Sequence, residues 1–189
     1  MSSFTKTKYS YIDYKNGKKI IHDENSDDEI PEDENNMDKI TPHIWLGNYK
    51  AAYDKKELDK YNINYIINIT DKIESPFNDK NYLIIPIRDK YSCDNKSKNY
   101  IMYQILKSFD FINTAINNNS NILIHCKKGH HRSANLILFY LVYKYNIGYI
   151  PALIYINNII KYALNRKTCV NKWGIEVYKD IVLLKNNYL

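Results

Sequence analysis

The segment from Ile122 to Leu138, ILIHCKKGHHRSANLIL, constrains the fold more than any other part of the chain. It begins with a short apolar run typical of a buried strand and ends with an apolar run of helical character. Only a few polar residues separate the two runs, among them Cys126, Gly129 and Arg132. Because strands that alternate with helices are typical of α/β domains, we interpret the segment as a strand–loop–helix unit.

The loop of this unit has the composition of an anion-binding site. Five residues separate Cys126 from Arg132, and such a loop can curl around one phosphate with its N–H groups pointing inward. The following helix adds the positive end of its dipole, and the planar guanidinium of Arg132 can hold two phosphate oxygens. Gly129 supplies the backbone freedom of a tight loop. The residues expected to bind phosphate are Lys127, Lys128, Gly129, His130, His131 and Arg132.

Cys126 lies at the centre of this predicted site and is the candidate nucleophile. An electropositive site stabilises a thiolate, which can attack phosphorus and form a phosphocysteine intermediate. Ser133 can donate a hydrogen bond to the sulfur and so help it to leave in the second step. A lone cysteine is more often a small buried apolar residue. Here His125, Gly129 and Ser133 accompany it between a strand and a helix, which favours the chemical role.

Four segments carry a resemblance to a known family. HCKKGHHRSA resembles the H-C-x-x-G-x-x-R-[ST] signature of the protein tyrosine phosphatase superfamily, and HIWLGNYKAAYD, INYIINIT and YLIIPIRDKYSCDN are similar to segments of its dual-specificity branch. The resemblance spans about Lys39 to Leu184 and implies a single catalytic domain with a protein tyrosine phosphatase-like fold. It implies that the nucleophile is Cys126, the phosphate-binding arginine Arg132, the hydroxyl that assists hydrolysis Ser133, and the residue that tunes the thiolate His125.

The resemblance also implies a general acid, which phosphoester cleavage requires in any case because the leaving oxygen must be protonated. Asp89 matches this acid, and Asp94 is the alternative. The loop departs from the family pattern at Lys128, where a small residue is usual, and at His131, where Ser, Gly or Asn is usual. Both departures make the loop bulkier and more cationic, which leaves the substrate preference open.

No metal and no cofactor are expected. His130 and His131 could be interpreted as a metal-binding pair, but adjacent histidines in a tight anion loop cannot easily share one ion.

The rest of the chain predicts strands that alternate with helices. Strands are expected at 39–47, 63–70, 81–87 and 121–126, and helices at 48–61, 98–117, 132–145, 150–162 and 171–185. Loops are expected at 71–80 and 88–97, and Asn48 is expected to cap the first helix. This order predicts an α/β domain with a central, mostly parallel sheet flanked by helices.

The formal net charge of +6 is unevenly distributed. Residues 22–38 contain nine acidic residues and no Lys or Arg, so residues 1–38 are expected to form a disordered acidic tail ahead of a catalytic domain at 39–189. The domain holds 22 Lys and Arg against 11 Asp and Glu, a formal charge of +11. Such a basic body favours acidic partners, namely phosphorylated proteins, anionic lipids or nucleic acid.

Cellular location is predicted from cysteine usage and the first residues. Three cysteines at wide spacing do not form a disulfide framework and fit a reducing compartment. The start of the chain lacks an apolar signal core, and the longest apolar stretch is too short to span a membrane. These features predict a soluble intracellular protein, cytoplasmic or alternatively nuclear, and they leave the oligomeric state open.

Three functions are compatible with these residues. The leading one is a phosphatase that acts on phosphotyrosine and phosphoserine or phosphothreonine in proteins. The second keeps the fold but acts on polyanionic substrates such as phosphoinositides or RNA 5′-triphosphates, although nucleic acid is the less favoured partner. The third is a module that binds phosphate without catalysis, which the presence of Cys126, Arg132, Ser133 and Asp89 disfavours.

Overall fold

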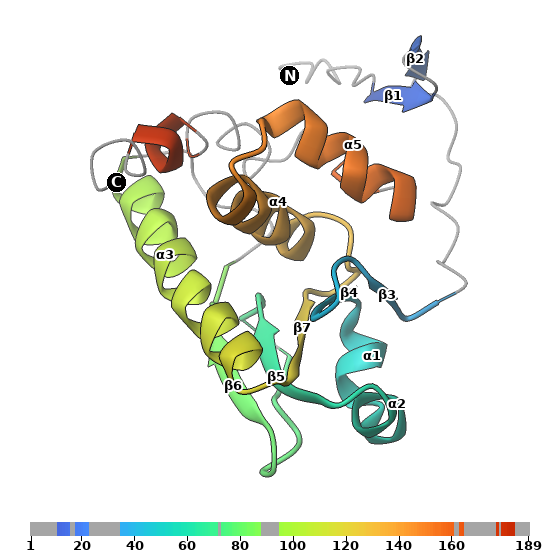
Figure 1. Cartoon of the computed structure of the whole chain (residues 1–189), viewed down its shortest axis with the longest axis vertical. Helices are drawn as coiled ribbons and strands as arrows, with labels where there is room; N and C mark the ends of the chain where they lie inside the picture. Colours follow the sequence, from blue (N-terminus) through green and yellow to red (C-terminus); the bar gives the residue numbers. More distant parts are fainter. Residues whose placement is uncertain are drawn as a thin grey trace, which may run out of the picture.

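The computed structural model describes residues 11–15, 18–22, 35–71, 73–87, 95–160, 163–164, 177 and 179–183 (Figure 1). In this part of the chain one sheet has the strand order β3-β4-β7-β5-β6. Strands β4, β7, β5 and β6 are parallel, and β3 is antiparallel to β4. The predicted mostly parallel sheet is therefore confirmed. The strands are β3 (Met37–Lys39), β4 (Ile44–Gly47), β5 (Ile63–Asn68), β6 (Asn81–Ile84) and β7 (Asn121–His125).

Helices cover both faces of this sheet (Figure 1). One face carries α1 (Tyr49–Tyr53) and α2 (Lys55–Lys60), and the other carries α3 (Asn95–Asn117) and α4 (Arg132–Tyr145). Helix α5 (Tyr149–Ile159) packs on α4. Because side chains alternate along a strand, Trp45 and Leu123 pack with the first pair of helices, whereas Leu46 and Ile124 belong to the core around α4.

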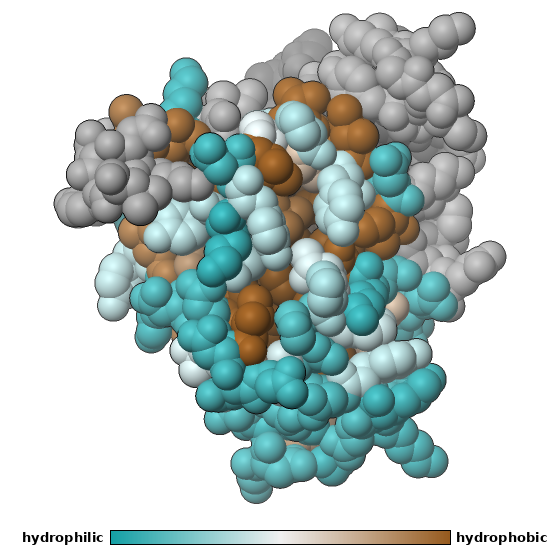
Figure 2. All heavy atoms as spheres, in the orientation of Figure 1, coloured by the Kyte–Doolittle hydropathy of each residue, from teal (hydrophilic) through white to brown (hydrophobic). Residues whose placement is uncertain are grey.

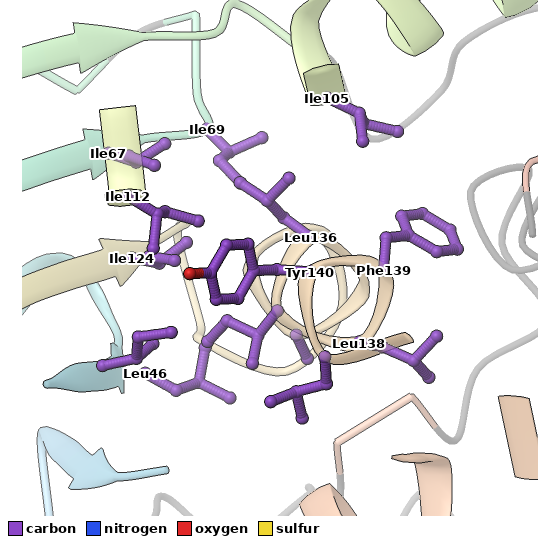
Figure 3. Close-up of a cluster of buried hydrophobic side chains, with 14 of the residues drawn as sticks. Leu46, Ile67, Ile69, Ile105, Ile112, Ile124, Leu136, Leu138, Phe139 and Tyr140 are labelled. Carbon is purple, nitrogen blue, oxygen red and sulfur yellow. The ribbon is translucent and has the colours of Figure 1, made fainter. Parts of the chain in front are cut away.

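Helix α4 lies at the centre of the larger core (Figure 3). Every residue from Arg132 to Val142 is buried. In Figure 3, Leu46 and Ile124 of the sheet lie around the ring of Tyr140, whose hydroxyl donates to Asn113 Oδ1 of α3 at 2.9 Å. Burial raises the pKa of Tyr140 to about 12, so the phenol keeps its proton and this hydrogen bond at neutral pH. This packing fixes α4, the helix that begins at Arg132.

Two predicted elements are divided in the structure. The strand predicted at 39–47 is two strands, β3 and β4. The prediction of a single helix at 48–61 is wrong, because the helix is interrupted at Asp54. The N–H of Asp54 donates to the Ala51 carbonyl, and its carboxylate accepts from Glu57 N at 3.1 Å. Asp54 thus ends α1 and begins α2. The predicted cap at Asn48 is present, with its side chain accepting from Ala51 N at 3.1 Å.

Both ends of the chain are described only in part, and they contain short elements of secondary structure. A hairpin of β1 (Tyr11–Lys15) and β2 (Lys18–His22) lies inside the segment predicted to be disordered, and β3 begins before the predicted domain start. Residues 23–34 lie outside the described residues, so the domain boundary stays a prediction. Towards the C-terminus, residues 177 and 179–183 are helical, within the range predicted for the last helix.

The described surface is divided by polarity. Figure 2 shows hydrophilic side chains over α1, α2 and the adjoining end of the sheet, and hydrophobic ones around α4 and α5. Exposed apolar side chains on α5 include Ile150, Ile154 and Tyr155. Among the described helices, none combines the length and the hydrophobicity that crossing a membrane would require.

Candidate active site

The candidate loop joins the central strand of the sheet to the most buried helix. β7 ends at His125, Cys126 follows directly, and Arg132 is the first residue of α4. In open parallel sheets, ligands bind at the carboxyl ends of the strands, which is where this loop lies. The structure therefore contains the predicted strand–loop–helix unit, and the rigid strand and helix hold both ends of the loop.

The sulfur of Cys126 accepts two hydrogen bonds. The N–H of Gly129 and the hydroxyl of Ser133 both lie 3.3 Å from Sγ. Ser133 is fully buried and Cys126 is 3% exposed, so water competes little with these donors. Cys126 is a free thiol. The structure thus brings the Ser133 hydroxyl and the Gly129 N–H to the sulfur.

The backbone of the loop is turned so that carbonyls point outward. Because a trans peptide directs the N–H of the next residue opposite to the carbonyl, outward carbonyls at positions 127 and 130 leave the N–H groups of Lys128 and His131 pointing inward. Inward N–H groups are the arrangement that an anion-binding nest requires, and phosphate binding by the loop stays a prediction. The outward bonds run from Ile69 N to His125 O at 2.9 Å, Tyr49 N to Lys127 O at 3.3 Å, Leu164 N to His130 O at 2.7 Å and Asn135 N to His131 O at 2.8 Å.

Gly129 is required by the backbone at its position. Its φ of +80° lies in the left-handed region, and a Cβ atom there would lie 3.0 Å from the backbone C and O of Gly47. The loop thus packs directly on the end of β4. A side chain at position 129 would meet both a conformational cost and a backbone that cannot move aside.

Gly129→Ala is expected to lower the free energy of unfolding by about 1–2 kcal/mol, from the left-handed backbone alone. It is also expected to lower the turnover of a phosphoester at least tenfold, because the loop must move away from Gly47. Gly148→Ala is the matched control, since a Cβ at Gly148 meets only the Pro151 side chain at 3.4 Å. Thermal unfolding and turnover of both variants are the measurements. Equal effects at the two positions would contradict this account of the loop.

Arg132 is 7% exposed and lies at the start of α4. Its Nη1 donates to the carbonyl oxygen of Ile87 at 2.9 Å. Ile87 follows β6 and directly precedes residues 88–94, so the candidate phosphate clamp contacts the root of the segment that contains Asp89 and Asp94. Both aspartates lie outside the described residues.

His125 is almost fully buried, with 1% of its surface exposed. Burial lowers its pKa to about 4, and the charge of Arg132 adds to the shift although the backbone of Cys126 opposes it. The imidazole is therefore neutral at physiological pH. Any influence of His125 on the sulfur comes from a neutral ring, and the positive charge of the site comes from other groups.

The remaining loop residues divide into two groups. Lys127 and Lys128 are exposed, so their charges face a ligand that approaches from solvent. His130 is 5% exposed and His131 is partly buried, with ring centroids 6.3 Å apart and nearly perpendicular planes. In the described part of the chain, no group of three or more His, Cys, Asp or Glu is arranged to hold a metal ion.

Sequence reasoning missed several groups that support the loop. Ile87, Tyr49 and Leu164 act through backbone atoms, which every residue type possesses, so no pattern of side chains reveals them. Asn135 was detectable in principle, as a polar residue within an apolar helix. Its Nδ2 donates to the His131 carbonyl at 3.1 Å and braces the first turn of α4.

Comparison with known proteins agrees with this geometry. The family model of the dual specificity phosphatase catalytic domain matches residues 44–172. Dual specificity protein phosphatase 22 of Xenopus tropicalis is 31% identical over 119 residues, which are 63% of this chain and 54% of that protein. Dual specificity protein phosphatase Mpk3 of Drosophila melanogaster is 35% identical over 103 residues, 53% of this chain and 24% of that protein. The chain thus spans less than two thirds of either relative.

A solved structure shows the same architecture. The crystal structure of human DUSP28 has a TM-score of 0.68 and 15% sequence identity, and covers 79% of this chain and 96% of that chain. Identity at this level shows the fold alone. The family model matches well over half of the chain, and the chain therefore belongs to the dual specificity phosphatase family.

Proposed function

We propose that this chain hydrolyses phosphotyrosine and phosphoserine or phosphothreonine in proteins through a phosphocysteine intermediate. The observation that carries the proposal is the sulfur of Cys126, which accepts from Gly129 N–H and Ser133 Oγ at the base of a loop that ends in Arg132. A sulfur held by two donors inside a nest of N–H groups is suited to in-line attack on a bound phosphate.

In the first step the Cys126 thiolate attacks phosphorus, a sulfur–phosphorus bond forms, and the bond to the leaving oxygen breaks. The leaving oxygen takes a proton from the general acid. Inward N–H groups of the loop, the N-terminus of α4 and Arg132 stabilise the phosphoryl oxygens, on which the charge is spread. Arg132 would exchange its bond to the Ile87 carbonyl for phosphate oxygens.

In the second step water attacks phosphorus and passes a proton to the carboxylate of the same acid. The sulfur–phosphorus bond breaks, inorganic phosphate is released and the thiolate returns. Ser133 donates to the sulfur at 3.3 Å and so stabilises the negative charge that develops as the sulfur leaves. No step in this cycle requires a metal, so a chelator is not expected to inhibit the reaction. Vanadate is expected to inhibit it.

Asp89 is proposed as the acid because of its distance along the chain from Ile87. The Ile87 carbonyl lies 2.9 Å from Nη1 of Arg132, the proposed phosphate clamp. Asp89 is two residues further along, a span of at most about 8 Å, whereas Asp94 is seven residues away. The short link favours Asp89, since the acid must reach an oxygen bonded to the phosphorus.

Asp89→Asn is expected to lower kcat for phosphoserine and phosphotyrosine peptides by a factor of about 10² to 10⁴, the usual contribution of a positioned general acid. The loss should be much smaller for an aryl phosphate with an activated leaving group, because that oxygen leaves without much protonation. Steady-state kinetics on both substrates, with Asp94→Asn as the control, provide the test. If Asp94→Asn shows the selective loss and Asp89→Asn does not, Asp94 is the acid.

The substrate class is tested by one activity panel. Phosphate release is measured side by side from a phosphotyrosine peptide, a phosphothreonine peptide, a phosphoinositide and a triphosphorylated RNA. Phosphopeptides are expected to be hydrolysed fastest. The exposed charges of Lys127 and Lys128 give the polyanionic substrates a physical basis, and release from those alone would replace the proposal. Tight phosphopeptide binding with no release from any substrate would indicate a non-catalytic module.

We infer that the protein works in the reducing interior of a cell. The proposed nucleophile is a free thiol, and the reaction requires it to remain reduced. Fluorescent tagging of the full chain would separate a cytoplasmic from a nuclear location.

A further inference from the structure

Leu164 has an unusual backbone conformation. Its φ is +63°, in the left-handed region. The other non-glycine residues with positive φ in the described part of the chain are Asn62, Asn119 and Asn146. Asparagine tolerates this region because its short polar side chain can bond locally to the backbone, whereas leucine has no such compensation. The conformation of Leu164 therefore costs free energy that another interaction must offset.

The offsetting interaction reaches the candidate active site. Leu164 N–H donates to the carbonyl oxygen of His130 at 2.7 Å. His130 lies in the phosphate loop, two residues before Arg132, and is 5% exposed. The hydrogen bond is thus short, its acceptor belongs to a buried residue, and it joins two chain segments 34 positions apart.

The described residues that precede Leu164 are held by hydrogen bonds and by packing. The turn after α5 is closed by Ala163 N–H, which donates to the carbonyl of Ile160 at 3.1 Å. Helix α5 is anchored by the buried Ala152 and Ile156 and by the Tyr155 hydroxyl, which donates to the carbonyl of Ile40. An N–H group held in this way can fix the direction of the carbonyl that it contacts.

The direction of the His130 carbonyl controls the peptide that follows it. Because the peptide unit is planar and trans, a carbonyl fixed outward turns the His131 N–H towards the centre of the loop. That N–H immediately precedes Arg132. If the peptide turned over, a carbonyl oxygen would face the phosphate and repel it.

We propose that Leu164 is a positioning residue, whose backbone N–H holds the peptide between His130 and His131 in the orientation that binds the phosphoryl group. The proposal rests on the proposed function, since the ligand of the loop is a substrate phosphate. It adds the turn after α5 to the parts of the chain that set activity.

The test removes this one donor and leaves the side chain in place. Leucic acid, the α-hydroxy analogue of leucine, is incorporated at position 164 of the full chain, which replaces the N–H by an ester oxygen. The dissociation constant of vanadate is expected to rise about fivefold and kcat for an aryl phosphate to fall about tenfold, as for a lost hydrogen bond in a buried site. The same replacement at Leu153, within α5, is the matched control for loss of a backbone donor.

A purely structural role would lower the melting temperature of the two ester variants alike and leave the vanadate affinity of the folded protein unchanged. Vanadate affinity and kcat within about twofold of the Leu153 control would overturn the proposal. If the unmodified protein hydrolyses no phosphoester, the proposed function fails, but vanadate affinity still decides the role of Leu164.

Leu164→Gly provides an independent variant that keeps the donor. Glycine adopts positive φ without strain, so this variant is expected to retain kcat and vanadate affinity within about twofold. Its melting temperature is expected to fall, because the Leu164 side chain packs against the main core. Loss of vanadate affinity in Leu164→Gly would mean that the leucine side chain, not its N–H, acts on the loop, and would overturn the proposal.

Discussion

Cys126→Ser is expected to lower turnover of a phosphotyrosine peptide by a factor of at least about 10³, while the dissociation constant of the peptide stays within about threefold of that of the wild type. Serine is close to cysteine in size, so the nest of inward N–H groups and Arg132 should still hold the phosphate. A hydroxyl at this position is far less acidic than a thiol and supplies no anionic nucleophile. Turnover and peptide binding, measured on the same preparation, test both halves of this expectation.

The other cysteines are natural controls for this variant. Cys93→Ser and Cys169→Ser, both outside the described residues, are expected to keep wild-type turnover. Residual activity of Cys126→Ser within tenfold of the wild type would rule out the sulfur as nucleophile. Loss of peptide binding together with activity would show that the loop had collapsed rather than lost its nucleophile.

Arg132→Lys is expected to lower kcat/KM for the same peptide by a factor of about 10² to 10³, the range found when one key donor to a transition-state oxyanion is removed. Lysine keeps the positive charge but not the planar pair of donors that fits two phosphate oxygens. It also loses the geometry of the Nη1 contact with the Ile87 carbonyl, so the root of the segment with Asp89 is less constrained. Steady-state kinetics and thermal unfolding are the measurements.

Lys127→Gln is the control that separates a geometric clamp from a general positive field. Lys127 is exposed, so solvent screens its charge and the loss in kcat/KM is expected to be less than about tenfold. Equal losses for Arg132→Lys and Lys127→Gln would mean that charge, and not the shape of the guanidinium, determines phosphate binding.

The core of the candidate site could be predicted because its residues are close together in the sequence. Cys126, Gly129, Arg132 and Ser133 lie within eight consecutive positions, and a strand before them and a helix after them set their geometry. Gly129 illustrates the point, since the positive φ that a tight loop requires is present at that position. The parallel sheet was predictable for a similar reason, namely the alternation of apolar strands with helices.

The supports of the loop were not predictable because they depend on tertiary packing. Leu164 and Ile87 contact the loop through backbone atoms, and nothing in a leucine or an isoleucine signals that role. The break at Asp54 was missed because the spacing of apolar residues continues through it, while the capping bond that ends one helix and begins the next depends on local backbone angles. The low pKa of His125 likewise follows from burial, which the sequence does not quantify.

The proposed mechanism requires that the phosphoryl group be transferred to Cys126. Ser133→Ala, which removes the donor at 3.3 Å from the sulfur, should slow the second step more than the first and let the intermediate accumulate. This variant is mixed with a phosphopeptide carrying radiolabelled phosphate, quenched within its first turnover, digested and mapped. Label is expected on the fragment that contains Cys126. Label on another residue, or released phosphate without any labelled protein, would contradict it.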